Sequence, residues 1–478
     1  MSDETSSKTE WAELTPSTEI DISDSENAKL LETFLQSISA AEGSQAVADG
    51  SLSADYNALA DLHPADFSDQ LEQLNDEDRE SVVSFAPQLI TPDVLAELED
   101  EVVEDILPLL PSIQIAEAVS ALDNDDATQI IEEMEPEQLE EVFDALGQDQ
   151  RAMLEASLQF EDETIGRLMQ RKFVAAPEFW TVGDTIDHMR ETGEALPDQF
   201  FNIYIINAGF KPLGYISLSK LMRAPRGQRL SEIMDRQLTV IQQEMDQEDA
   251  AYLFQKYNLI SAPVVDETGR LSGMMTIDDI LTIVQTENTE DILALAGVSD
   301  AGLTDTAFSI VKARGPWLFI NLLTAILASF VIARFDYAIS EIVALAVLMP
   351  IVASMGGNAG TQALTVAVRA LSERDLTPKN AWRAVRREAG AALIIGIIFA
   401  FALAGIAFVW FGDAELACVA FIAMIINHLF AGLAGIVVPL GLKRFGADPA
   451  VSSSVFVTTV TDIVGFFAFL GFAALVLL

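Results

Sequence analysis

Residues 448–465 read DPAVSSSVFVTTVTDIVG and open the last apolar stretch of the chain. From Ala450 to Leu478 this stretch contains one charged residue, Asp462. Because about 20 apolar residues span the hydrocarbon core of a bilayer, the pattern predicts a transmembrane helix. A carboxylate at the centre of such a helix costs on the order of 2.5–3.5 kcal/mol on insertion scales. Intramembrane acids are typical of ion pathways, although one can also hydrogen-bond a neighbouring helix. We therefore expect Asp462 to face a cation path.

Two other oxygen-bearing residues share the predicted helix face of Asp462. Asp448 precedes it by 14 residues, about 21 Å along a helix and close to the same angular position. Thr458 lies one turn before Asp462. The stripe therefore has acids at the mouth and the middle of the span, with a hydroxyl between them. His428 and Asn427, in the preceding apolar segment, are weaker signals, because a lone buried histidine more often serves packing.

The C-terminal third of the chain contains five apolar segments, which we predict to be transmembrane helices: 317–335, 342–368, 389–411, 416–442 and 450–478. Lysine and arginine concentrate in the loops after the second and fourth segments. Because cytoplasmic loops carry the positive excess, the N-terminus is expected inside and the C-terminus outside.

The second apolar segment contains Pro350 and paired glycines at 356 and 357. These residues predict a broken helix, which membranes tolerate where the backbone is buried in protein or lines an aqueous cavity. Its carbonyl groups and neutral side chains would then offer oxygen ligands to an ion, the side chains being Asn358, Thr361, Gln362 and Thr365. The alternative is close helix packing through small residues. All the predicted donors are oxygens, which suits a hard divalent cation such as hydrated Mg²⁺.

Charge is divided unevenly along the 478 residues, whose net charge is −46. Residues 311–478 hold 11 basic and 9 acidic residues, which leaves 16 basic and 64 acidic residues for 1–310. Such acidity argues against nucleic acid as a partner and suits cations, although adaptation to a salty medium would also explain it. One cysteine allows no intrachain disulfide. No apolar run follows positive charge at the N-terminus, so a signal peptide is not expected.

The soluble part divides into a tail, a repeat region and an α/β region. Residues 1–58 are polar and acidic, and we predict them to be disordered. Residues 59–160 contain a fourfold repeat with a spacing of 24, which predicts stacked helical hairpins. Its aligned positions are 67/91/115/139, 71/95/119/143, 74/98/122/146 and 82/106/130/154, all apolar except Thr91. The alternative is an irregular helical bundle.

Residues 161–286 contain a second repeat, in which 213–221 parallels 272–280 at a distance of 59 residues. Each copy predicts a strand, a turn and a helix start, which resembles the tandem CBS module, here 161–225 and 226–286. In nucleotide-binding CBS modules a hydroxyl and an Asp three residues later contact ribose or phosphate. The second copy has both, Thr276 and Asp279, whereas the first has Ser217 with Lys220. We expect at most one adenine-nucleotide pocket per chain, with ATP as the candidate ligand. The alternative is a CBS pair that is purely structural.

From about residue 60 onward the chain resembles the MgtE family of magnesium transporters. The resemblance rests on Pro350–Gln362, on Asp448-Pro449-Ala450 with Thr458–Asp462, and on Thr276–Asp279 through Thr289–Ile292. It implies a multidomain membrane protein: an all-α N-domain, an α/β CBS pair, a connecting "plug" helix at 287–314 and a five-helix transmembrane domain at 315–478. It also implies a homodimeric Mg²⁺ channel of the bacterial inner membrane, in which Asp462 of each subunit holds hydrated Mg²⁺ near Gly357, Thr361 and Thr365.

The resemblance further implies cytosolic Mg²⁺ sensing by the acidic residues Glu248, Asp279, Glu287, Glu290 and Asp291. Three positions depart from the family pattern: Val455 replaces a frequent proline, and Thr282 and Asn258 replace frequent acids. Bound Mg²⁺ would offset repulsion in the acidic domains and hold the plug helix over the pore. The alternatives are a broader Co²⁺, Ni²⁺ or Mn²⁺ transporter and a nucleotide-sensing receptor without transport. No enzyme is expected, because no nucleophile–base pair or nucleotide-hydrolysis loop is found.

Overall fold

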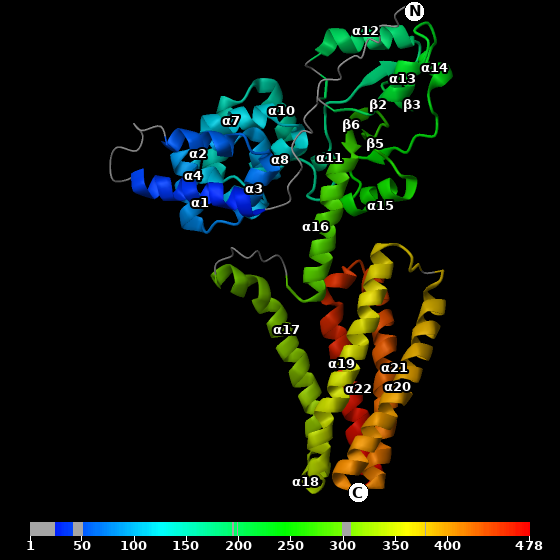
Figure 1. The fold of residues 1–478 in the computed structure, drawn as a ribbon. Helices are drawn as coiled ribbons and strands as arrows, with labels where there is room; N and C mark the ends of the chain where they lie inside the picture. The colour runs from blue at the N-terminus through cyan, green and yellow to red at the C-terminus, as the bar shows by residue number, and fades with distance from the viewer. Residues whose placement is uncertain (1–23, 42–50, 194–195, 198, 299–306, 378) are drawn as a thin grey trace, which may run out of the picture. The chain divides into compact units, whose positions relative to one another are not determined.

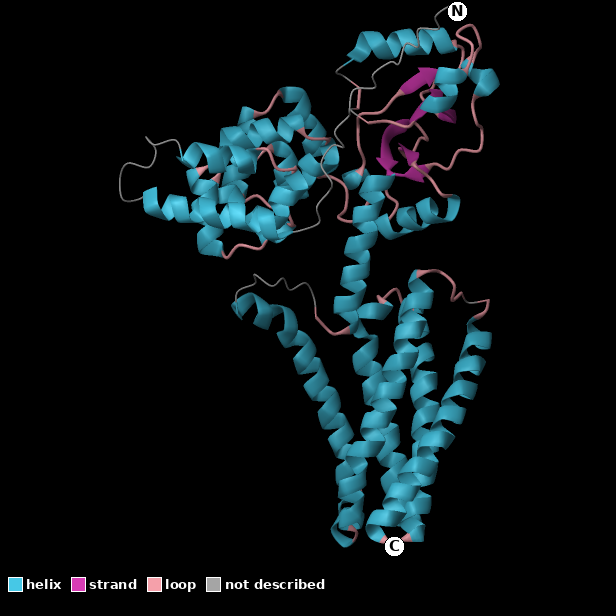
Figure 2. Ribbon diagram, viewed as in Figure 1, coloured by secondary structure: helices cyan, strands magenta, loops and turns pink. Residues whose placement is uncertain are grey.

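A computed structural model describes residues 24–41, 51–193, 196–197, 199–298, 307–377 and 379–478 (Figure 1). They form two compact units. The first contains the described residues up to Asp246 together with Ser261–Met275, and the second contains Gln247–Ile260 together with Thr276–Leu478. Helices account for nearly all regular structure, and the strands are confined to the first unit (Figure 2).

The 24-residue repeat forms four successive pairs of short helices, as predicted. The pairs are α3 (Pro64–Glu72) with α4 (Asp76–Phe85), α5 (Pro92–Glu97) with α6 (Asp100–Ile106), α7 (Ser112–Ala121) with α8 (Asn124–Glu132), and α9 (Pro136–Ala145) with α10 (Gln148–Ser157). Short 3-10 turns, η2 (Pro87–Leu89) and η3 (Leu107–Leu109), follow α4 and α6. The repeated position on the second helix of each pair is buried, at 0–3 % exposure, in Val82, Ile106, Ile130 and Leu154. Thr91, the polar exception, caps α5 by accepting the N–H of Val94.

The prediction of disorder over 1–58 is wrong for two segments. Helix α1 (Asp24–Ala41) precedes α2 (Ser51–Ala60), and α1 packs against α2, α3 and α4. Leu31, Phe34 and Ile38 recur at helical spacing and join the core of the repeat domain, with Phe34 at 0 % exposure. The acidic composition of the tail obscured this apolar stripe. Residues 1–23 and 42–50 lie outside the described residues.

The CBS region contains two three-stranded sheets, with orders β1-β2-β3 and β4-β5-β6. In the first sheet β1 pairs parallel with β2, and β2 pairs antiparallel with β3. The strands are β1 (Ala175–Pro177), β2 (Asn202–Ile206), β3 (Pro212–Ser217), β4 (Ile241–Gln242), β5 (Ser261–Val265) and β6 (Leu271–Thr276). The helices in this region of the first unit are α11 (Ile165–Leu168), α12 (Val182–Thr192), α13 (Leu218–Arg223) and α14 (Leu230–Ile233). The repeated strand, turn and helix start are therefore confirmed in both copies.

The second unit is all helical. Its elements are α15 (Gln247–Tyr257), α16 (Ile277–Leu295), α17 (Ala307–Ala333), α18 (Asp336–Glu341), α19 (Val343–Ser372), α20 (Ala381–Phe411), α21 (Ala414–Arg444) and α22 (Pro449–Val476). Five of them, α17 and α19–α22, are long and apolar enough to cross a membrane, as the five segments predicted. Helix α21 packs along α19, α20 and α22, and α17 contacts α22 (Figure 1). This makes α21 the most enclosed of the five.

Two helices differ from the sequence predictions. Helix α19 is continuous from Val343 to Ser372, although it contains Pro350. Proline removes one backbone donor, and membrane helices tolerate the loss where neighbouring groups compensate; α17 and α21 likewise contain Pro316 and Pro439. Helix α16 begins at Ile277 and ends at Leu295, earlier than the connecting helix predicted over 287–314. It stops because Gly297 adopts φ +72° and its N–H bonds the carbonyl of Ala294.

Candidate functional site

Asp462 is the fourteenth of the 28 residues of α22, halfway along the helix. Its side chain is partly exposed in the single chain, whereas the adjacent Thr461 is fully buried. The Thr461 hydroxyl donates to the carbonyl oxygen of Thr458 at 2.9 Å. Asp448 caps the first turn of the same helix, its Oδ1 accepting the N–H of Ala450 at 2.8 Å. The continuous α22 therefore has Asp448 at its N-cap and Asp462 at its centre, and their sharing of one face stays a prediction.

Helix α19 has two different faces along its middle. Gly356 and Gly360 are buried on one face, where a Cβ built on Gly360 would lie 2.6 Å from Val457 Cγ1 of α22. The other face is exposed in the single chain and carries the polar side chains of Ser354, Asn358, Thr361, Gln362 and Thr365. Gly357 is partly exposed, and nothing lies within 4 Å of a Cβ built on it.

The two interpretations of this segment, a pore lining and close helix packing, therefore apply to different residues. Close packing explains Gly356 and Gly360, as the small-residue alternative predicted. The Thr365 hydroxyl donates to the Thr361 carbonyl at 3.0 Å within α19. The amides of Asn358 and Gln362 are costly against an apolar lipid environment, which would offer them no hydrogen-bond partner. The backbone of α19 is helical throughout, so its carbonyl groups are not turned outward as a broken helix would turn them.

The far end of α16 packs on the ends of three membrane helices. Ala294 and Leu295 join a cluster with residues of α19, α21 and α22, namely Leu364, Val368, Ala434, Ala450 and Val457. Beside this cluster, the Ser372 hydroxyl at the end of α19 donates to Asp291 Oδ2 at 2.8 Å. Burial raises the pKa of Asp291, the Ser372 hydrogen bond lowers it, and the negative charge of Asp448 raises it further. The charge of Asp448 therefore acts on Asp291, so these two predicted ligands from different elements influence each other electrostatically.

The other predicted sensor residues are distributed along α15 and α16. Glu248 lies in the first turn of α15, and Gln247 Nε2 donates to Glu287 Oε1 of α16 at 2.6 Å. Glu287, Glu290 and Asp291 fall within about one turn of α16. Across the described part of a single chain, no group of three or more His, Cys, Asp or Glu side chains gathers as a metal site.

The predicted nucleotide contacts serve a local structural purpose here. The Thr276 hydroxyl donates to Asp279 Oδ2 at 2.6 Å, and the Thr276 N–H donates to the same oxygen at 3.1 Å. The second of these bonds is one half of a capping box that starts α16, and in the other half the Thr276 side chain accepts the backbone N–H of Asp279. A nucleotide bound by these two side chains would have to compete with the cap. Of the residues that depart from the family pattern, Asn258 and Thr282 are exposed and Val455 is partly exposed.

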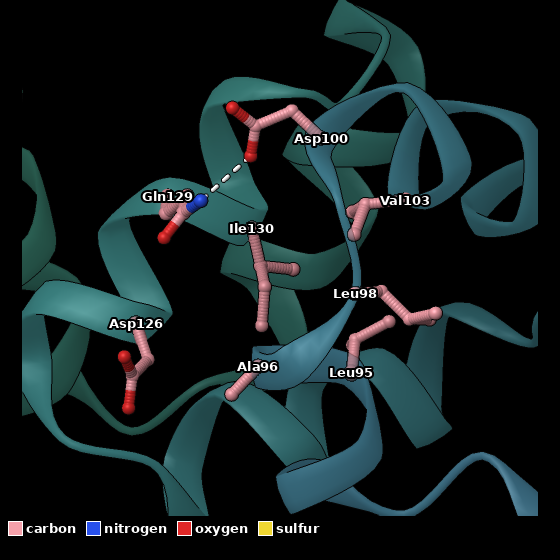
Figure 3. A pocket seen from close by; sticks show the side chains of 8 residues that line it. All are labelled: Leu95, Ala96, Leu98, Asp100, Val103, Asp126, Gln129 and Ile130. Atoms are coloured by element: carbon pink, nitrogen blue, oxygen red, sulfur yellow. Dashed lines mark hydrogen bonds between the residues drawn. The ribbon is translucent and has the colours of Figure 1, made fainter. Parts of the chain in front are cut away.

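A hollow in the repeat domain is lined by Leu95, Ala96, Leu98, Asp100, Val103, Asp126, Gln129 and Ile130 (Figure 3). Gln129 Nε2 spans it to Asp100 Oδ1 at 2.6 Å. The space open to a water-sized sphere is about 10 Å³, room for about one water molecule. This hollow is too small to bind a nucleotide.

Asn427, a weak signal in the sequence, joins two helices in the structure. It lies on α21, fully buried, and its Nδ2 donates to the Val352 carbonyl of α19 at 2.8 Å. The available signal was an amide within an apolar segment. His428 is also buried, stacks on Phe399 and has its Nδ1 3.1 Å from the Met424 carbonyl, whereas its Nε2 has no hydrogen-bond partner among the described residues.

Three family models match this chain: a divalent cation transporter domain, MgtE, over residues 349–472, the MgtE intracellular N domain over 62–163, and CBS domains over 165–227 and 230–286. The magnesium transporter MgtE of Thermus thermophilus is 34% identical over 332 residues, covering 68% of this chain and 73% of the relative. This chain belongs to the MgtE family. The MgtE transporter of Bacillus subtilis is 29% identical over 66% of this chain and 70% of its own length.

Two solved structures are similar to about half of this chain. The cytosolic domain of the Mg²⁺ channel MgtE in complex with ATP is 28% identical, with a TM-score of 0.47, and covers 54% of this chain and 99% of that one. The soluble part of a magnesium transporter is 21% identical, with a TM-score of 0.45, over 55% of this chain and 99% of that one. The relatives in this MgtE family are named as transporters rather than enzymes.

Proposed function

We propose that this protein is a Mg²⁺ channel of the bacterial inner membrane, which imports Mg²⁺ down its electrochemical gradient and closes when internal Mg²⁺ binds. The observation that carries the proposal is Asp462, an acid halfway along an apolar spanning helix and partly exposed. The names of the relatives support Mg²⁺ as the ion. Mg²⁺ loses its waters reluctantly, so one carboxylate with neutral oxygens suits the hydrated ion.

A second copy of the chain completes the path in this proposal. The exposed polar face of α19, with Asn358, Thr361 and Thr365, would be unfavourable against lipid and favourable against water in a shared pore. Two-fold symmetry would place a second Asp462 opposite the first, so that two carboxylates share one hydrated divalent ion. Gly357, which has open space beside it, lets an ion approach the α19 backbone.

Closure is proposed to act through α16. Its end packs on α19, α21 and α22, and Asp291 on α16 faces the charge of Asp448. Because two carboxylates repel each other across this contact, Mg²⁺ bound there would hold α16 in place. Glu248, Asp279, Glu287 and Glu290 are proposed to bind further regulatory Mg²⁺ across subunits. The acidic domains and α16 are then cytosolic, and the C-terminus lies outside. ATP binding at Thr276 and Asp279 stays a prediction, since the cap competes with it.

The test is Mg²⁺ uptake in a strain that depends on added Mg²⁺. Asp462→Ala and the isosteric Asp462→Asn should each lower uptake by at least about tenfold, because one lost charge contact is worth about 1.4 kcal/mol or more. Glu415→Gln, at an exposed acid in the first turn of α21, is the matched control and should transport normally. Normal uptake by Asp462→Asn would contradict the proposed path. Competition by Co²⁺, Ni²⁺ and Mn²⁺ separates a Mg²⁺ channel from a broader divalent transporter.

A further inference from the structure

Asn427 lies where three membrane helices meet. Its side chain is at 0 % exposure on α21, and its Nδ2 donates to the Val352 carbonyl oxygen of α19 at 2.8 Å. A Cβ built on Gly356 of α19 would lie 2.1 Å from this Nδ2, and one built on Gly465 of α22 would lie 2.8 Å from it. One amide therefore fills the space that two glycines leave open on two different helices.

The glycines determine how the amide reaches its acceptor. In an α-helix the N–H of residue 356 bonds the carbonyl of residue 352, so Val352 and Gly356 bound the same turn. A carbonyl oxygen has two lone pairs and can accept a second donor. The missing side chain at Gly356 leaves that carbonyl accessible, and any larger residue would collide with Asn427.

The contact adjoins the proposed ion path on both helices. Gly356 directly precedes Gly357 and Asn358 on α19, and Gly465 follows Asp462 by one turn on α22. Asn427 itself is on α21, which carries no residue of the proposed path. The amide on α21 therefore contacts α19 and α22, the two helices that carry the proposed path, without being part of that path.

Filling space is not a sufficient reason for an amide at this position. A buried amide costs free energy unless its groups are hydrogen-bonded. Among the described residues, Oδ1 of Asn427 has no hydrogen-bond partner. An apolar side chain of similar volume would avoid that cost, but could not bond the Val352 carbonyl.

We propose that Asn427 is a positioning residue that fixes the spacing between α19 and α22, and with it the distance from Asp462 to the oxygens of α19. This inference rests on the proposed function. Selection of a hydrated ion depends on how many surrounding oxygens its waters reach and at what distance. Moving α19 relative to Asp462 should therefore change the ratio of Mg²⁺ to Ca²⁺ flux more than it changes the amount of folded protein.

The experiment compares Mg²⁺ and Ca²⁺ flux through the full-length protein in liposomes. Asn427→Ala should lower the ratio of Mg²⁺ to Ca²⁺ flux by roughly tenfold, since displacements of about 1 Å are costly in positioned sites. Gly356→Ala should lower it similarly, because the three atoms nearest its new methyl all belong to Asn427. The double variant Gly356→Ala/Asn427→Ala should remove the collision but keep the lowered ratio, because neither new side chain can bond the Val352 carbonyl.

The outcomes separate positioning from mere structural support and from failure of the path itself. If the single variants reduce both fluxes and the amount of protein equally, with an unchanged ratio, Asn427 only stabilises the bundle and the inference is overturned. A wild-type ratio in the double variant would overturn it as well, because the spacing would then not depend on the amide. Asp462→Asn, measured in parallel, should abolish Mg²⁺ flux. If it conducts like the wild type, the proposed function fails and the positioning inference fails with it.

Discussion

Arg79 shows how one residue can stabilise a repeat domain that is otherwise coated with acids. It is 1 % exposed and donates to the carbonyls of Leu71 and Leu74 and to Asp105 Oδ2, the last at 2.8 Å. The Leu71 carbonyl lies in the last turn of α3, the Leu74 carbonyl lies in the turn after it, and Asp105 belongs to α6 of the next pair. A single guanidinium therefore joins two successive helical pairs. Arg151 occupies the equivalent repeat position 72 residues later, with partly exposed ion pairs to Asp144 and Glu155.

Arg79→Ala should destabilise the repeat domain by about 3 kcal/mol, because it empties the space of a buried side chain and removes its bonds to the Leu74 carbonyl and to Asp105. Arg151→Ala is the matched control and should cost less than about 1 kcal/mol, as exposed ion pairs do. Hydrogen exchange of α4 and α6 measures the local effect in the full chain. Equal effects of the two substitutions would show that burial of Arg79 does not matter.

Glu133 gives this domain a pH dependence. Burial raises its pKa to about 6, and the negative charges of Asp100, Glu104 and Glu132 act in the same direction. The folded-state pKa of Glu133 lies above its unfolded value. The stability that the protonated side chain contributes is therefore fully present below about pH 4.5 and is lost as the pH rises through about 6. Glu133→Gln should therefore stabilise α8 at pH 7 and have no effect at pH 4.5.

The gain from Glu133→Gln should stay below about 1 kcal/mol, since solvent screens a partly exposed side chain. Hydrogen exchange of α8 at the two pH values measures it. Glu140→Gln, at an exposed position of α9, provides the control. A gain that is independent of pH would contradict the assigned cause.

At the scale of elements, the sequence predicts best where its periodicity is long. The 24-residue spacing and the five apolar segments predicted the helix pairs and the spans, because each depends on many residues. The break in the second span was wrong, since whether Pro350 interrupts a helix depends on neighbouring helices that no local pattern contains. Asn427 shows the same limit at the site, because its partner Val352 is 75 residues away.

Helix α16 is the element whose docking can be tested directly. Ala294 is 7 % exposed within its contact with α19, α21 and α22. Ala294→Asn should undock the helix, because it places a larger polar group in an apolar cluster. We expect Mg²⁺ uptake to continue at internal Mg²⁺ levels that close the wild type. Ile292→Asn, two residues away at 68 % exposure, is the matched control and should close normally.

At the scale of the whole molecule, charge separates the two functions proposed here. The chain carries a net charge of −46, yet residues 311–478 hold 11 basic and 9 acidic residues. The acidic region can therefore respond to divalent cations while the spanning region stays nearly neutral. The boundary between the acidic region and the nearly neutral spanning region follows from composition alone. The start of α16 at Ile277 is seen only in the structure.

Removing residues 1–275 should leave conduction intact and weaken closure by internal Mg²⁺, because Glu248 and most other acids are lost while Asp291 and Asp448 remain. Current recorded from membrane patches with controlled Mg²⁺ on the internal face measures both properties. Closure at the same internal Mg²⁺ as in the full-length protein would show that the removed acids do not contribute to closure.

The central position of Asp462 has an electrical consequence. An ion that reaches residue 14 of 28 in α22 has crossed about half of the span. Moving one elementary charge across 100 mV is worth about 2.3 kcal/mol. A divalent ion crossing half of that voltage gains about the same amount, which corresponds to roughly a fifty-fold increase in occupancy. In the proposed path, occupancy at Asp462 would then depend on voltage as well as on concentration, and depolarising the cell would lower that occupancy without any movement of the protein.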